Sequence, residues 1–109
     1  PNAASAAPAM DGLLVELSQK DAGGWLGCHI YLMEDGTFSV TYDYTADNAG
    51  IEAAKGTYVD NGDGTLTLTA DSGEEITVTV TDNGDGTKTY AAEVTEVNTS
   101  IVCNPTGKR

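Results

Sequence analysis

The chain has few basic residues. Among its 109 residues, Lys and Arg number 5 against 17 Asp and Glu, which gives a formal net charge of −12. A nucleic-acid-binding surface needs a cluster of Lys and Arg that neutralises phosphates, so this composition excludes nucleic acid as a partner. The same shortage argues against binding to an anionic membrane surface. The acidic excess indicates a well-solvated surface, or a basic or cationic partner.

Long apolar segments are also missing. No segment approaches the roughly 18 consecutive apolar residues of a membrane helix, so we expect no membrane insertion. The opening "PNAASAAPAM" has no apolar periodicity, and we interpret residues 1–10 as a disordered Ala/Pro-rich leader. Residues 11–109 then have the size of a single domain, which we expect to be monomeric.

Residues that usually carry catalysis are scarce. The one histidine, His29, falls inside an expected strand, where a lone histidine is usually packed or partly exposed. No Cys/His cluster suits zinc, and no serine lies in a nucleophile elbow. We therefore predict that the protein is not an enzyme and that it uses no cofactor.

The two cysteines, Cys28 and Cys103, lie far apart and outside any CxxC motif. An even count in a small Thr/Gly-rich domain predicts one disulfide, formed in an oxidising compartment. The alternative is two unrelated buried thiols. Because the leader also looks like what remains after signal-peptide cleavage, we expect a secreted or periplasmic, extracellular protein.

Strand-like alternation is abundant. "TLTLTA" at 65–70 and "ITVTVT" at 76–81 place aliphatic residues on one face and threonines on the other, as half-buried antiparallel strands do. "WLGCHIYLM" at 25–33 is apolar on both faces, with Leu26 grouped with Cys28, and we expect a central strand covered on both sides. Other expected elements are a strand or short helix from Leu13, strands at 37–44 and 87–94, and a last strand at 100–103.

Short loops with Asp-Gly pairs separate these segments, and such loops favour hairpins between consecutive strands. The sequence therefore predicts an all-β fold, an antiparallel meander of about eight strands that forms a small barrel or sandwich. Residues 45–54 make the longest break, which we expect to cap a barrel end or to form a short helical turn.

The hexapeptide "DNGDGT" occurs at 60–65 and again at 82–87. Aligned with a helical calcium loop, both copies lack the first ligand and the final bidentate acid. Asn-Gly and Asp-Gly instead supply the positive φ angles of tight turns, so we favour the turn interpretation. The alternative is a shared ion site between the two loops, and its candidate ligands are Asp60, Asp63, Asp82 and Asp85.

Five tyrosines stand against one phenylalanine, and tyrosine hydroxyls seek polar partners. Tyrosines at a barrel mouth would suit a ligand, whereas tyrosines on an outer face would suit a protein partner. The candidate binding residues are Trp25, Tyr31, Tyr42, Tyr44 and Tyr58.

Residues 25–95 resemble small lipocalin-like (calycin-type) domains of extracytoplasmic bacterial proteins. The similar segments are "MEDGTFSV", "KGTYVDNGDGTLTLT" and "EEITVTVTDNGDGT", in which Gly56–Tyr58 match the Gly-x-Tyr element of such domains. The lipocalin Gly-x-Trp signature is only approximated, by "GGWLG" around Trp25. The resemblance implies a closed barrel, no catalysis, and either a ligand cavity or an inhibitory surface.

Taken together, these features predict a secreted, non-enzymatic binding domain that recognises a partner protein or a small apolar ligand. One alternative is an inhibitor of a secreted hydrolase, such as a protease inhibitor, that acts through its N-terminal tail or a hairpin tip. Another is a surface adhesion or stalk module.

Overall fold

The computed structural model describes residues 11–43, 51–95 and 102–108. Their regular structure consists of strands, and the alternation of apolar and polar side chains noted above defines most of them. The strands are β1 (Leu13–Lys20), β2 (Gly27–Met33), β3 (Thr37–Asp43), β4 (Ile51–Asp60), β5 (Thr65–Ala70), β6 (Glu75–Asp82), β7 (Lys88–Ala92), β8 (Val94–Thr95), β9 (Val102–Cys103) and β10 (Thr106–Lys108).

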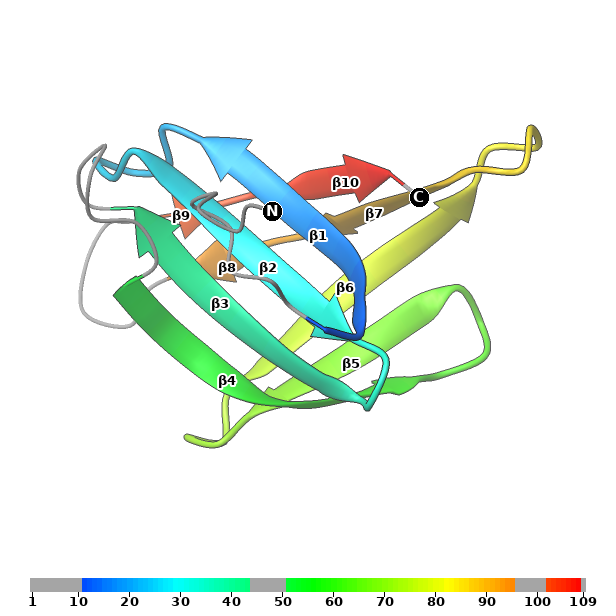
Figure 1. Cartoon of the computed structure of the whole chain (residues 1–109), viewed down its shortest axis with the longest axis horizontal. Coiled ribbons are helices and arrows are strands. Elements are labelled where there is room, and N and C mark those ends of the chain that lie inside the picture. Colours follow the sequence, from blue (N-terminus) through cyan, green and yellow to red (C-terminus); the bar gives the residue numbers. More distant parts are fainter. Residues whose placement is uncertain (1–10, 44–50, 96–101, 109) are drawn as a thin grey trace.

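Eight of these strands form a closed antiparallel barrel in the order β1-β10-β7-β6-β5-β4-β3-β2. Strands β1 to β7 follow one another around the barrel, and β10 closes it beside β1 (Figure 1). The prediction of an all-β meander is confirmed, and the structure selects the barrel over the sandwich. Leu13 begins a strand, which removes the helical alternative for that segment.

The sequence pattern did not predict the strand that closes the barrel. Residues 100–103 were expected to form the last strand, but Val102–Cys103 pair with β8 in a separate two-stranded sheet. The barrel closes instead through β10, which has only three residues and no apolar alternation. A Cβ added at Gly107 would lie 2.6 Å from the backbone oxygen of Glu16, so only glycine allows this close approach to β1.

The barrel interior is filled by the aliphatic residues that the alternation predicted. The buried hydrophobic residues are Val15, Leu17, Ala22, Cys28, Ile30, Tyr31, Leu32, Phe38, Val40, Tyr42, Leu66, Leu68, Ala70, Ile76, Val78, Tyr90, Ala92, Val94 and Cys103. The threonines of β5 and β6 occupy the opposite face, as solvent-facing strand residues do.

Two details of the expected strands were wrong. Leu26 was grouped with the buried face of β2, but it is 45% exposed and precedes that strand. The backbone N–H of Asp21 donates to the oxygen of Leu26 (2.7 Å), so residues 21–26 form a turn rather than an extended segment. Residues 51–54 were expected to belong to a break, but they begin β4, while residues 44–50 lie outside the described residues.

The centre of β2 is covered on both sides, as predicted. Ile30 and Leu32 point into the barrel and are fully buried. Tyr31 points outward, yet only 9% of it is exposed, and its ring stacks on His29 at a centroid distance of 5.9 Å.

The predicted disulfide is present between Cys28 on β2 and Cys103 on β9, with the two Cα atoms 6.2 Å apart. Both cysteines are completely buried. The bond ties an early barrel strand to the segment that leads into the closing strand.

Candidate functional site at the barrel mouth

Three Asp-Gly-Thr tripeptides, at 35–37, 63–65 and 85–87, lie in the hairpin turns β2–β3, β4–β5 and β6–β7. Because the strands are antiparallel and consecutive, alternate hairpins fall at the same end of the barrel. We call this end the mouth, and define it by residues 33–37, 58–66 and 80–90. In these turns only the glycines have a positive φ, which explains why glycine occupies the middle position of each tripeptide.

Both "DNGDGT" loops have the same internal hydrogen bonds. In the first loop, Oδ1 of Asp60 accepts from the backbone N–H of Gly62 (2.9 Å), and Oδ1 of Asp63 accepts from the N–H (3.0 Å) and hydroxyl (2.6 Å) of Thr65. The Asn61 amide donates to the hydroxyls of Thr65 and Thr67. The second loop repeats every one of these contacts from Asp82 to Thr89. The carboxylates therefore cap turns, in agreement with the turn interpretation.

Hydrogen bonding also sets the ionisation of these loops. The hydroxyl and backbone N–H of the following threonine hold the pKa of Asp35, Asp63 and Asp85 below its usual value. The three negative charges are thus fixed at the mouth. In the part of the chain that the structure describes, no three His, Cys, Asp or Glu side chains come close enough to hold a metal ion.

A pocket of about 410 Å³ opens at the mouth. Its apolar wall consists of Leu14, Leu32, Leu66 and Val80, together with the rings of Tyr58 and Tyr90. Asp60 and Lys88 are the charged residues that line it. This combination of an apolar wall and a few polar groups is typical of a small-molecule site, and the volume falls in the usual range for such sites, about 300–1,000 Å³.

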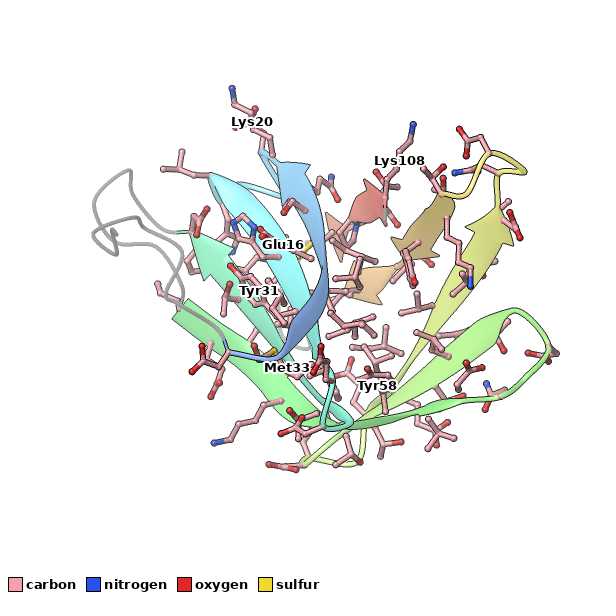
Figure 2. The ribbon with its side chains drawn as sticks, turned by 45° about the vertical axis from the view of Figure 1, so that its right-hand side comes forward. Glu16, Lys20, Tyr31, Met33, Tyr58 and Lys108 are labelled. Carbon is pink, nitrogen blue, oxygen red and sulfur yellow. A yellow bond between two sulfur atoms is a disulfide. The ribbon has the colours of Figure 1, made fainter. Side chains whose placement is uncertain are left out.

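Tyr58 is anchored in this pocket. Its hydroxyl donates to the backbone oxygen of Met33 (2.7 Å), and Figure 2 shows both residues at the same end of the barrel. Burial raises the pKa of Tyr58, and the negative charges of Asp35, Asp60 and Glu34 raise it further. The tyrosine therefore joins the β4 end to the β2–β3 turn and remains neutral.

The candidate residues named from the sequence are not brought together. Tyr58 lines the mouth, but Tyr42 is buried in the core, where its ring contacts Trp25 at a centroid distance of 5.6 Å. Trp25 follows β1, in the loop at the opposite end of the barrel. Tyr31 lies on the outer face near Glu16 (Figure 2), and Tyr44 falls outside the described residues.

Sequence reasoning did not single out the aliphatic part of the pocket or Lys88. The alternation along β6 and β7 does indicate that Val80 and Lys88 occupy inward-facing positions, so it could have identified them. Which strand ends meet at one mouth, however, depends on barrel closure.

A polar network surrounds His29 on the outer face of β1, β2 and β3. Its Nε2 lies 2.8 Å from Oδ2 of Asp43, and its Nδ1 lies 3.2 Å from Oε2 of Glu16. The hydroxyl of Ser18 lies 3.0 Å from Nδ1 and donates to the same Glu16 oxygen (2.9 Å). Since a Cβ at Gly27 would lie 3.1 Å from Oδ2 of Asp43, glycine leaves room for that carboxylate.

The network contains the residue types of a hydrolytic triad, but its surroundings favour a structural role. Its members lie on three neighbouring strands, and the central one, β2, is paired on both sides. We interpret the network as a set of cross-strand hydrogen bonds that joins three neighbouring strands.

Comparison with known proteins finds no matching family model, and neither a curated protein nor a solved structure matches the chain. Among the described residues, no helix is long and apolar enough to cross a membrane.

Proposed function

We propose that this protein is a secreted, non-enzymatic binding domain that holds a small apolar ligand in its mouth pocket. The observation that carries the proposal is the pocket of about 410 Å³, whose wall is formed by four aliphatic side chains and two tyrosines. A pocket of this kind removes apolar ligand surface from water, at roughly 25 cal/mol per Å² buried.

The rest of the fold is compatible with this proposal. The disulfide suits an extracellular or periplasmic protein, because such bonds persist in oxidising compartments. The closed eight-stranded barrel is the format of lipocalin-like domains, so the proposal includes a relationship to that group. Tyr58, one of the residues expected at a ligand site, lines the pocket.

A neutral fluorescent probe, N-phenyl-1-naphthylamine, tests the proposal. We expect its fluorescence to increase on binding to the wild-type protein. Val80→Trp should abolish the increase, because the indole ring would fill a pocket to which Val80 contributes. Val59→Trp is the matched control, since Val59 is 61% exposed near the same end of the barrel.

Two outcomes would contradict the proposal. One is a wild-type protein that binds neither the probe nor any neutral competitor. The other is equal probe binding by the Val80 and Val59 variants. Trp25, the chain's single tryptophan, lies at the other end of the barrel, so its own emission should change little when the mouth is occupied.

Recognition of a partner protein is the second candidate. The three Asp-Gly-Thr turns display exposed carboxylates around the mouth, which would suit a basic surface. A hydrolase inhibitor that uses its N-terminal tail belongs to the same class, but residues 1–10 lie outside the described residues. Deleting residues 1–9 should leave probe binding intact, whereas an inhibitor of this kind would lose potency without a change in melting temperature.

A further inference from the structure

The charges at the mouth are strongly unequal. Its three segments carry six carboxylates, from Glu34, Asp35, Asp60, Asp63, Asp82 and Asp85, and one ammonium group, from Lys88. Lys108, whose Cα pairs with that of Thr89 near the start of β7, adds a second ammonium group at the same end of the barrel. Lys88 pairs with Asp82 in the register of β6 and β7, so one of these carboxylates lies directly across from it. The pocket lining itself holds one charge of each sign, Asp60 and Lys88, and the excess of carboxylates lies in the turns around it. Such an excess of one sign attracts ligands of the opposite sign toward the opening.

Hydrogen bonds hold five of these six carboxylates in place. Asp60 and Asp82 each accept a hydrogen bond from a backbone N–H two residues later. Asp35, Asp63 and Asp85 each accept two from the following threonine. For Asp35, Asp63 and Asp85, the hydrogen bonds from the threonine lower the pKa and so favour the ionised carboxyl group.

The negative field reaches into the pocket itself. Tyr58 is part of the pocket wall, and its pKa is raised first by burial and then by Asp35, Tyr90, Asp60 and Glu34. Three of these four neighbours are carboxylates. Carboxylates that oppose a phenolate at Tyr58 also repel an anionic ligand beside this residue. They attract a cationic ligand at the same place. The rings of Tyr58 and Tyr90 add faces on which a cation is attracted.

We infer that the mouth pocket is selective for an apolar molecule that carries an ammonium group, with the ammonium held at the Asp60 side and the apolar part against Leu14, Leu32, Leu66 and Val80. This inference rests on the proposed function, because it needs the pocket to bind a ligand at all. In this arrangement, the Asp60 carboxylate attracts the ammonium group of the ligand, and the Lys88 ammonium group repels it.

Three ligands of one shape test the charge preference: 4-phenylbutylammonium, 4-phenylbutanol and 4-phenylbutyrate, each measured by displacement of the neutral probe at pH 7. We expect the ammonium to bind at least about tenfold more tightly than the carboxylate, with the alcohol between them. The preference should shrink as salt is raised, because exposed charges are screened.

Two substitutions that change the charge of the pocket in opposite directions test the role of each residue. Asp60→Asn keeps the oxygen that accepts from Gly62 and removes one negative charge, so it should weaken ammonium binding by about fivefold. Lys88→Gln should strengthen ammonium binding by a similar factor. Asp71→Asn, in the turn between β5 and β6 at the opposite end, makes the same charge change as a control and should have no effect.

The outcomes separate this inference from the function on which it rests. If none of the three ligands displaces the probe and the probe itself does not bind, the proposed function fails. If the alcohol binds but the carboxylate binds as tightly as the ammonium, only the charge assignment fails. Weaker ammonium binding in Lys88→Gln would also overturn that assignment, since it would mean that the lysine helps to hold the ligand.

Discussion

Reducing the Cys28–Cys103 disulfide should destabilise the barrel by about 4 kcal/mol. The bond spans 75 residues of sequence, and in the chain-entropy model a closed loop of that length removes about 15 cal/mol/K from the unfolded state. For a domain of this size, 1 kcal/mol shifts the melting temperature by about 4 °C, so we expect a decrease of roughly 15–20 °C.

The location of the bond adds a local effect. Strand β10 closes the barrel with three residues, and its register with β1 contains a single Cα pair, Ser18 with Thr106. Cys103 lies three residues before β10, so the disulfide anchors the segment that places the closing strand. Reduction should therefore raise hydrogen exchange in β10 more than in β5 and β6, which are paired along their length.

Urea unfolding of the oxidised and reduced wild-type protein, followed by Trp25 fluorescence, measures the global effect. Using the reduced wild type avoids the cavity that a Cys-to-Ala double variant would create at two fully buried positions. If the reduced protein unfolds with a free energy within about 1 kcal/mol of the oxidised one, the disulfide does not stabilise the barrel as predicted. Equal exchange rates in β10 before and after reduction would show that the bond does not anchor the closing strand.

Other predictions concern the packing and the turns. Gly56→Ala should cost more than about 1 kcal/mol, because the new Cβ would lie 2.0 Å from the backbone oxygen of Thr69; an unchanged melting temperature would count against this. Leu68→Ala should cost about 2–5 kcal/mol in urea unfolding, since Leu68 is fully buried, whereas Thr67→Ala on the other face should cost less than about 1 kcal/mol. Because the folded pKa of Asp63 is lowered, its contribution to stability is present above the unfolded value near 4 and is lost as the pH falls through the folded value. Asp63→Asn should therefore flatten the acid side of a plot of melting temperature against pH, and an unchanged slope would disprove the assignment.

The hairpins were predictable because their determinants are local. Alternating residues such as Leu66 and Thr67 assign the two faces of a strand, and Asp-Gly pairs supply the turns between strands. The even number of cysteines likewise predicted the Cys28–Cys103 disulfide. Leu26 broke the pattern because the turn at 21–26 left it outside the strand.

The candidate site was only partly predictable, because its residues come from strands that meet only when the barrel closes. In the sequence, nothing distinguished three aromatic residues that lie in or next to expected strands: Trp25, Tyr42 and Tyr58. The structure separates them between the two ends of the barrel, and it places Val80 and Lys88 beside Tyr58 instead.

Local patterns and composition were thus enough to predict the all-β class, the meander of hairpins, the disulfide and the acidic character of the chain. These features depend on alternation, turn chemistry and composition, which act over a few residues or over the whole chain. Two features became apparent only in the folded molecule. The sheet closes into a barrel through Thr106–Lys108, and an apolar pocket forms at the barrel end that carries the three Asp-Gly-Thr turns. The physical reason is that closure depends on the close approach of backbones distant in sequence, at Gly107 and Glu16, and a short strand without apolar alternation gives no local sign of it.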